Sequence, residues 1–300
     1  MAKVKKVGFN FFRPIIEKEN GDEVFINLKP LFDIIKKNYQ SARESKIAEE
    51  YKYVYTYNNE PARLADITID VDTQYYHLIF ERLDYQLPNR TTLHGESKML
   101  DLQEDEFIGI DVSVLYDSEN HIMMIQRNRS SLGPAGIEKF IRTLLQTTGE
   151  EGTFNLAIVS DTTAKRRAFN QSSYRKIQMK IIGTKADGLV EKLFSKNAGG
   201  IESVEISFNS KTGKNDKLDD EFSKRILEEY IDNDEVVRLQ IRAREEEEGI
   251  VEPLDLIDHK MQTYIMFDFI GDRQLNAISV FYEMTNKYIN GGYKNKILRK

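Results

Sequence analysis

The chain has 300 residues, of which 40% are hydrophobic and 31% are charged, so it is long enough for one large domain or for two of ordinary size. It contains no cysteine, which excludes disulfides, cysteine-ligated zinc and a cysteine nucleophile. The formal net charge of −6 means that a polyanion could bind only to a local basic patch.

The first half of the chain reads as strands interrupted by two helices. Alternating apolar residues and the turn signal Asn20-Gly21 predict a hairpin at the start. Apolar residues at helical spacing predict one helix that contains Leu31 and another that contains Ile137. Further strands are expected within residues 51–70, 75–85 and 107–128, the last of which forms a hairpin that turns at 117–120.

The second half shows the same mixture of patterns. Strands are expected at 153–161, 174–183, 201–209, 235–244, 250–258 and 262–269. Helices are expected at 188–197 and 222–231, and a last helix is marked by a row made of Leu275, Ile278, Tyr282, Thr285 and Ile289. The pattern breaks at 147–152, TTGEEG, where we place a domain boundary. The sequence thus predicts an α+β protein with two sheet-plus-helix domains, 1–149 and 150–300, and mixed, largely antiparallel sheets.

The stretch HIMMIQRNRSSLGPAG, residues 121–136, leads from a predicted strand into a predicted helix. Pro134 suits the first position of a helix, where its missing N–H group is no loss, and Gly133 can then cap the helix. The glycine and the proline are therefore explained by geometry, and a phosphate-binding loop is not required.

In three of the predicted strands, successive basic residues stand two or four positions apart, and Gln178 and Gln240 occupy the positions between those that are four apart. Because side chains alternate between the two faces of a strand, the basic residues of each strand share one face. They are Arg127 and Arg129 in the first strand, Lys176 and Lys180 in the second, and Arg238, Arg242 and Arg244 in the third. Residues two apart lie roughly 6.7 Å apart along a strand. Such a sheet would offer rows of cations to the phosphates of a nucleic acid.

The segment 163–185 strengthens this interpretation, because it has seven Lys or Arg residues and no acidic residue. Phe169 and Tyr174 lie among the charges, an arrangement that suits base stacking together with backbone contacts. The segment adds four cations to the candidate site, namely Lys165, Arg166, Arg167 and Arg175. The alternative is that all these cations merely solvate the wet face of an antiparallel sheet.

Two other patterns have both a functional and a structural interpretation. Four tyrosines share one face of the strand 51–57 and could stack on bases, but tyrosine is also common on a half-buried sheet face, which we favour. They are Tyr51, Tyr53, Tyr55 and Tyr57. The four carboxylates of 245–248 could bind a metal ion, but adjacent side chains diverge, so we expect a solvated hairpin tip.

No motif identifies a catalytic centre. The four histidines lack a paired metal-binding spacing, and no Walker, GxSxG or kinase signature occurs. Asp84 followed by Glu96 and Lys98 resembles the pattern of metal-dependent nucleases, in which carboxylates hold Mg²⁺ and a lysine supports the attacking water. That pattern belongs on a core strand, whereas here it follows the loop-like TTLHG. A nuclease is therefore kept as an alternative, and we expect neither a cofactor nor a resident metal.

Two of these segments resemble the RexA-like exclusion proteins of lambdoid prophages. SSLGPAGIEKFI, residues 130–141, is similar to their mid-chain segment, and VRLQIRAREEEEGIVEPL, residues 237–254, looks like a later strand with its acidic turn. The order of the elements agrees over most of the chain, but only Gly133, Pro134 and 242–244 carry over by position. The order is also distantly similar to that of the KwaB component of the Kiwa antiphage system, and the chain resembles an uncharacterised bacterial family of similar length.

The resemblance implies a protein of phage exclusion or antiphage defence that binds DNA with little sequence preference, as a homodimer and without an established catalytic centre. A sensor or adaptor that binds a partner protein of the defence system is the other role we consider. The negative net charge argues against strong nonspecific affinity for DNA. Because no apolar run approaches the roughly 20 residues of a membrane span, we expect a cytoplasmic protein that does not insert into a membrane.

Overall fold

The computed structural model of the chain consists of two compact units. Unit 1 comprises residues 1–158 and 265–300, and unit 2 comprises residues 159–264. The structure describes residues 3–45, 53–57, 59–85, 88–91, 94–103, 106–146, 149, 151–161, 163–195, 201–213, 215–231, 233, 235–246, 249, 251–257, 260–269 and 275–298.

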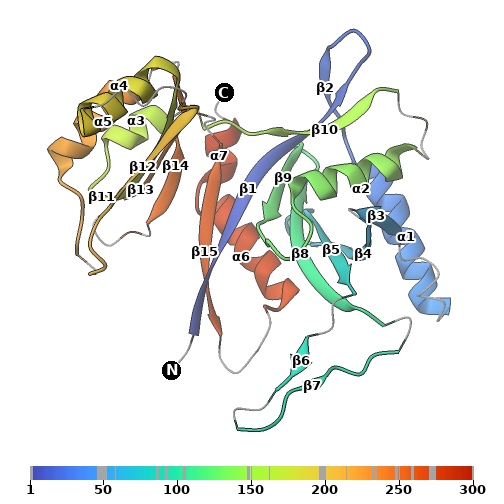
Figure 1. Ribbon diagram of the computed structural model, residues 1–300. Coiled ribbons are helices and arrows are strands. Elements are labelled where there is room, and N and C mark those ends of the chain that lie inside the picture. The colour runs from blue at the N-terminus through green and yellow to red at the C-terminus, as the bar shows by residue number, and fades with distance from the viewer. Residues whose placement is uncertain are drawn as a thin grey trace. The chain divides into compact units, whose positions relative to one another are not determined.

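Unit 1 is built around a nine-stranded sheet (Figure 1). Seven of its strands lie in the order β10 (Thr153–Ile158), β1 (Lys3–Glu17), β9 (Ile122–Gln126), β8 (Ile108–Asp117), β5 (Tyr76–Asp84), β4 (Glu60–Ile69) and β3 (Val54–Tyr57). The other two, which also pair with β1, are β2 (Glu23–Phe25) and β15 (Gln262–Phe269). With 15 residues, β1 is long enough to contact four neighbours, so it organises the whole sheet.

Helices cover both faces of this sheet. Those of unit 1 in the described residues are α1 (Lys29–Ser45), α2 (Pro134–Gln146), α6 (Ala277–Ile289) and α7 (Tyr293–Leu298). Phe12 belongs to the core that includes the buried residues of α1 and α2. Its neighbour Phe11 points to the opposite face, where its ring stacks on Tyr288 of α6 and Tyr293 of α7 at centroid distances of 6.4 and 5.0 Å. The two halves of the alternating aromatic strand thus build two separate cores.

Unit 2 contains a four-stranded antiparallel sheet with helices on one face. The strands lie in the order β12 (Ser203–Asn209), β11 (Ser173–Ile182), β13 (Val236–Arg244) and β14 (Glu252–Asp255). The described helices are α3 (Ala164–Phe169), α4 (Gly183–Phe194) and α5 (Asp220–Tyr230). All three share one apolar core with the inward residues of β11 and β13, such as Ile177 and Ile241. The opposite face of the sheet therefore carries none of these helices.

The α+β class and the largely antiparallel sheets are confirmed. The division of the chain differs from the predicted 1–149 and 150–300, because β10 pairs with β1, and because α6 and α7 lie in unit 1. The predicted boundary is instead a turn between α2 and β10, with Gly149 and Gly152 at positive φ. A break in the apolar pattern marks any turn, so it does not reveal that the chain later returns to the first unit.

Most of the predicted elements are present, but the strands β6 (Asn89–Arg90) and β7 (Lys98–Met99), of two residues each, were not predicted. β9 ends at Gln126, short of the two arginines assigned to its face. The helices α3 and α7, of six residues each, were not predicted, because so short a helix leaves little periodicity to detect. The helix α2 begins at Pro134, as expected. No helix in the described ranges is both long and apolar enough to cross a membrane.

Candidate nucleic-acid interface

The helix-free face of the unit 2 sheet carries two of the three basic rows that the sequence predicts. On β11, Ile177 and Met179 are buried, which directs the alternate residues Lys176, Gln178 and Lys180 to the other face. On β13, the buried residues Leu239 and Ile241 direct Arg238, Gln240 and Arg242 to that same face. We call this surface the polar face; it is completed on the edge strand β12 by Glu205, Ser207 and Asn209 and on β14 by Asp255.

The register brings the two basic rows side by side. Lys176 is the cross-strand partner of Arg242, Gln178 that of Gln240, and Lys180 that of Arg238. The basic faces predicted for these two strands therefore form one surface, which alternation within each strand alone could not show. The polar residues of β12 extend it, because Asn209 is paired with Lys176 and Glu205 with Lys180.

The two ends of the polar face differ in electrostatics. At one end, Arg238 forms an ion pair of 3.0 Å with Glu205, which also accepts a hydrogen bond of 2.6 Å from Gln178. The hydrogen bond from Gln178, followed by the charge of Arg238, holds the pKa of Glu205 below its usual value. In the middle, Gln240 donates to Asp255 over 2.8 Å. At this end and in the middle, most of the polar and charged side chains therefore have partners within the sheet.

At the other end, a pair of cations has no counter-charge among the residues that the structure describes. Lys176 and Arg242 stand opposite each other, and their outer neighbours are the neutral residues Asn209 and Pro253. Neither cation has an ion pair with another residue that the structure describes, and the same holds for Lys180. Like charges directly opposite each other in a sheet are destabilising, by roughly 0.2–1 kcal/mol for such pairs. An anion between Lys176 and Arg242 would remove this cost.

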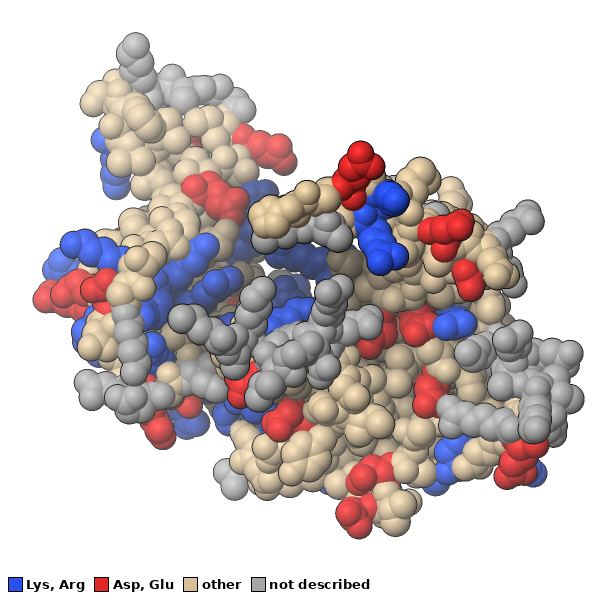
Figure 2. All heavy atoms as spheres, turned by 90° about the horizontal axis from the view of Figure 1, so that it is seen from below, with Lys and Arg blue, Asp and Glu red and all other residues tan. Residues whose placement is uncertain are grey.

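Chemically, this end of the polar face carries the kinds of hydrogen-bond donor that an oxyanion requires. The ammonium group of Lys176 has three donors, and the guanidinium of Arg242 has a planar fork that matches phosphate. The amide of Asn209 adds a neutral donor from the edge strand. Figure 2 shows that Lys and Arg side chains gather over part of the face of the molecule that it draws.

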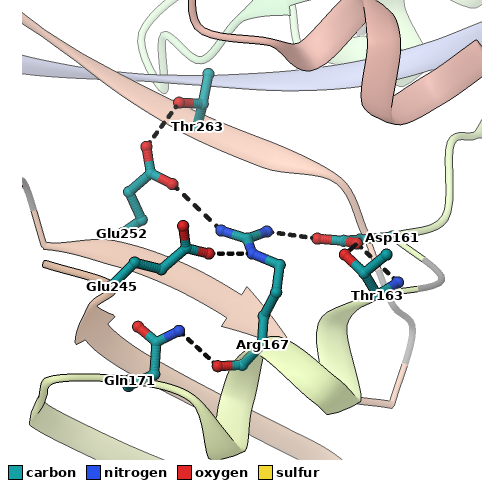
Figure 3. Close-up of polar contacts among 7 residues, drawn as sticks. All are labelled: Asp161, Thr163, Arg167, Gln171, Glu245, Glu252 and Thr263. Atoms are coloured by element: carbon teal, nitrogen blue, oxygen red, sulfur yellow. Dashed lines mark hydrogen bonds and ion pairs between the residues drawn. The ribbon is translucent and has the colours of Figure 1, made fainter.

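Arg167, predicted to bind nucleic acid, is instead occupied by three carboxylates (Figure 3). Its guanidinium lies 2.6 Å from Asp161 and 3.6 Å from Glu252, and it also binds Glu245. The prediction for this residue is corrected: Asp161 lies six residues before it, and the other two carboxylates, Glu245 and Glu252, come from segments far along the chain. The same contact shows that Glu245, expected at a solvated hairpin tip, has a structural role, whereas residues 247 and 248 lie outside the described residues.

The other cations of the segment 163–185 do not join the polar face. Lys165 and Arg166 are exposed on α3, whose buried residues Ala164 and Ala168 belong to the helix-covered core. Arg175 lies at an irregularity between β11 and β13, where the register shifts between Tyr174 and Lys176, and it is half-buried. Arg244 lies outside this segment, at the end of β13; it is half-buried, and alternation with the buried Ala243 places it on the same side of the strand as Arg242.

The predicted strand face of Arg127 and Arg129 is wrong. β9 ends at Gln126, and both arginines are exposed in the turn that leads to α2. They belong to unit 1, whereas the polar face belongs to unit 2. Only the backbone N–H of Arg127 continues the pairing, because it donates to the carbonyl of Gly8 on β1 over 2.8 Å, and the chain is already in a turn at Arg129.

The aromatic residues expected to stack on bases point into the protein. Tyr174 is fully buried and donates a hydrogen bond of 2.6 Å to the carbonyl of Ala168, and Phe169 packs against the same core. The tyrosines of β3 and the residue before it also pack against a core, as the favoured interpretation predicted. Their partners are Tyr39 for Tyr53, Phe140 for Tyr55 and Lys139 for Tyr57, while Tyr51 lies outside the described residues.

The nuclease-like residues lie in and near a peripheral hairpin of unit 1. Glu96 and Lys98 line a hollow of about 600 Å³ beside the short strands β6 (Asn89–Arg90) and β7 (Lys98–Met99). Asp84 ends β5, forms an ion pair of 3.0 Å with Arg82 and is not among the residues that line the hollow. The described residues contain no group of three or more His, Asp or Glu side chains that could hold a metal ion. The structure thus adds no support to this alternative.

Comparison with protein families matches residues 2–297 to a family of unknown function, DUF6731. A search of the curated proteins found no match. The family description carries no activity, so the resemblance to RexA-like proteins and to KwaB remains a prediction.

Proposed function

We propose that this chain, which belongs to the DUF6731 family of unknown function, binds the phosphate backbone of nucleic acid through the polar face of unit 2. The observation that carries the proposal is the pairing of Lys176 with Arg242 between neutral neighbours. The sheet tolerates an unfavourable like-charge pair where Gln or Ser would serve solvation equally well. A phosphate bound between the two cations accounts for that choice.

The dimensions of the polar face suit a backbone. Neighbouring strands lie about 4.8 Å apart, and residues four apart on a strand lie about 13 Å apart. The pair Lys176 and Arg242 is therefore separated from Lys180 by a distance that spans about two phosphate intervals of one strand. The residues between are Gln178 and Gln240, which can donate to sugar or phosphate oxygens.

The kind of binding follows from what the polar face offers. Its side chains are cations, amides, a hydroxyl and carboxylates, and no aromatic residue stands among them. The polar face therefore has no side chain on which an unpaired base could stack. We propose that it contacts the phosphate backbone of duplex DNA with little sequence preference. Few cations carry the contact, so the affinity is modest and strongly dependent on salt.

The proposed role is non-enzymatic. A place in phage exclusion or antiphage defence, a homodimer and a partner protein of the defence system are proposals that rest on the resemblance. A metal-dependent nuclease remains the alternative, and it is tested by incubating the same DNA with Mg²⁺ or Mn²⁺. Cleavage that disappears in Glu96→Ala would replace the proposal of a non-enzymatic binder.

Fluorescence anisotropy of labelled duplex DNA, its single strand and RNA, titrated with the protein at several salt concentrations, tests the proposal. The logarithm of the binding constant for duplex should fall linearly with that of salt, by about 0.9 for each phosphate contacted. The double variant Lys176→Glu, Arg242→Glu should lose most of the binding and flatten the salt dependence by about two contacts.

The matched control is Lys224→Glu, Arg225→Glu, which makes the same change of charge on exposed residues of α5. Because α5 packs on the other face of the sheet, this variant should bind as the parent does apart from a small long-range effect. Equal loss of binding in both double variants would mean that net charge alone is sensed, and the polar face would no longer be the site. Inorganic polyphosphate as a competitor measures how far the site discriminates nucleic acid from other polyanions.

A further inference from the structure

The helix α6 is apolar on two sides, and only one of them is covered by the protein. Val280, Met284 and Tyr288 are buried against the sheet of unit 1, and Phe281 stacks on His77 with a ring distance of 4.5 Å. A second apolar row on another side of the helix is exposed to solvent: Ile278 is 75%, Tyr282 69% and Ile289 39% exposed. A helix that is apolar on most of its circumference is normally buried all round.

The exposed side of α6 also lacks charge, in a chain of which 31% is charged. Its exposed residues are Ile278, Ser279, Tyr282, Asn286 and Ile289. The two charged residues of the helix, Glu283 and Lys287, are both half-buried beside this side. Depletion of charge around large apolar side chains and tyrosine is typical of the centre of a protein interface and not of a surface that faces water.

The spacing of the row defines what kind of element covers it. Ile278, Tyr282 and Ile289 are exposed, and Thr285 between them is half-buried, with its hydroxyl oxygen turned inward. The four residues follow each other at intervals of four, three and four, which is the seam by which one helix packs along another. Read in the opposite direction the intervals are the same, and isoleucine stands at both ends. The row is therefore complementary to an antiparallel copy of itself.

From this self-complementarity we infer that α6 forms a homodimer interface in which two copies of the helix pack antiparallel about a two-fold axis. Ile278 of one copy packs against Ile289 of the other, and Tyr282 packs against Thr285. Each of these contacts occurs twice, as an isologous interface requires. In a parallel arrangement, Tyr282 would face Tyr282 of the other copy and Thr285 would face Thr285. Two large side chains would then crowd one level of the interface, and two small ones would leave space at the next level. The parallel arrangement would also align the two helix dipoles unfavourably.

The size of the row sets the strength of the contact. Ile289 stands eleven positions after Ile278, which is about 16 Å along a helix. One helix pair of this length is smaller than a standard interface of about 1,600 Å², so the dimer forms and dissociates with concentration. The inference concerns unit 1 only and does not depend on nucleic-acid binding by unit 2.

Light scattering of the full chain over a range of concentrations tests the interface first. The mass should rise from that of one chain towards that of two, and Tyr282→Glu should raise the dissociation constant by about tenfold or more. The control is Val71→Glu, which adds the same negative charge elsewhere in unit 1. Val71 is 80% exposed on a turn, so the substitution should not disturb the fold. A monomer at every concentration, or equal effects of the two variants, would overturn the inference.

Cysteine cross-linking tests the relative direction of the two helices. Because the chain has no native cysteine, only the introduced thiols can react. Ile278→Cys and Ile289→Cys, each purified alone, should not cross-link with a short thiol-reactive linker, because equal positions lie far apart in the antiparallel pair. A mixture of the two variants should give a covalent dimer. Efficient cross-linking of each variant with itself, and none across the mixture, would contradict the antiparallel interface even if a dimer exists.

Discussion

Lys176 on β11 and Arg242 on β13 are direct cross-strand partners on the helix-free face of the unit 2 sheet. Neither has an acidic neighbour across the sheet, since the row continues to Asn209 on one side and Pro253 on the other. The pair costs stability in the free protein and gains a function only when an anion lies between the two cations. Stability and binding should therefore respond in opposite directions when the pair is altered.

Arg242→Gln should raise the free energy of unfolding by about 0.5 kcal/mol, because it removes the repulsion from Lys176. The same variant should weaken the binding of duplex DNA. Urea denaturation of the parent, Arg242→Gln, Lys176→Gln and the double variant measures the coupling between the two residues. A loss of stability in Arg242→Gln, or a coupling of favourable sign, would show that the pair is not repulsive.

Arg167→Met should lower the free energy of unfolding by about 3 kcal/mol, because it leaves the buried carboxylate of Asp161 without its ion pair. The side chain of Asp161 is only 7% exposed, so water cannot replace the lost partner. Arg166→Met on the same helix is the control, since Arg166 is exposed and should change stability little. Thermal unfolding followed by circular dichroism would compare the two, and equal stabilities would mean that the carboxylates stabilise unit 2 without Arg167.

Burial lowers the pKa of His77 to about 4, so the ring is neutral in the folded protein under ordinary conditions. In the unfolded chain its pKa is about 6.5. Below pH 6.5 the unfolded state therefore binds a proton that the folded state refuses, and the free energy of unfolding should fall by about 3 kcal/mol between pH 6.5 and pH 4. His77→Gln removes this contribution, so urea midpoints measured across that range should fall less steeply in the variant. Parallel pH profiles would contradict the assignment.

Tyr288→Phe should lower the free energy of unfolding of unit 1 by about 2 kcal/mol. The hydroxyl of Tyr288 donates a hydrogen bond of 2.9 Å to the carboxylate of Asp117, a residue that is only 1% exposed. This hydrogen bond joins α6 to the end of β8. Tyr85→Phe, on a tyrosine that is 62% exposed, is the control for loss of a hydroxyl. If urea denaturation gave both variants the stability of the parent, Lys294, 3.5 Å from Asp117, would be sufficient to hold that carboxylate.

The polar face shows how far local patterns reach. Alternation along β11 and β13 predicted which side chains of each strand point the same way, because this depends only on the geometry of one strand. That Lys176 meets Arg242, and that Glu205 neutralises Arg238, depends on strand order and register. Both are decided by which apolar faces can be buried together, and no short stretch of sequence contains that information.

The predictions that were wrong have the same origin, namely contacts between segments that are remote in the sequence. Arg167 looked like one more cation in an acid-free segment, but Glu245, 78 residues away, and Glu252 converge on it in the fold. Tyr174 looked like a stacking residue among charges, yet alternation combined with the helix-covered side places it in the core. On α6 the row through Ile278 and Tyr282 identified the helix, but the sheet is covered by its other apolar side.

By itself, the sequence determined the α+β class, most of the strands and helices, the start of α2 at Pro134 and the faces of β11 and β13. These follow from the periods of strand and helix and from the special geometry of proline, which act over a few residues. The tertiary structure alone decided that the chain returns to unit 1 at residue 265, that Lys176 and Arg242 stand opposite each other between neutral cross-strand neighbours, and that one apolar side of α6 faces solvent. Each of these results from packing between segments remote in the chain, where the burial of large apolar areas outweighs local preference.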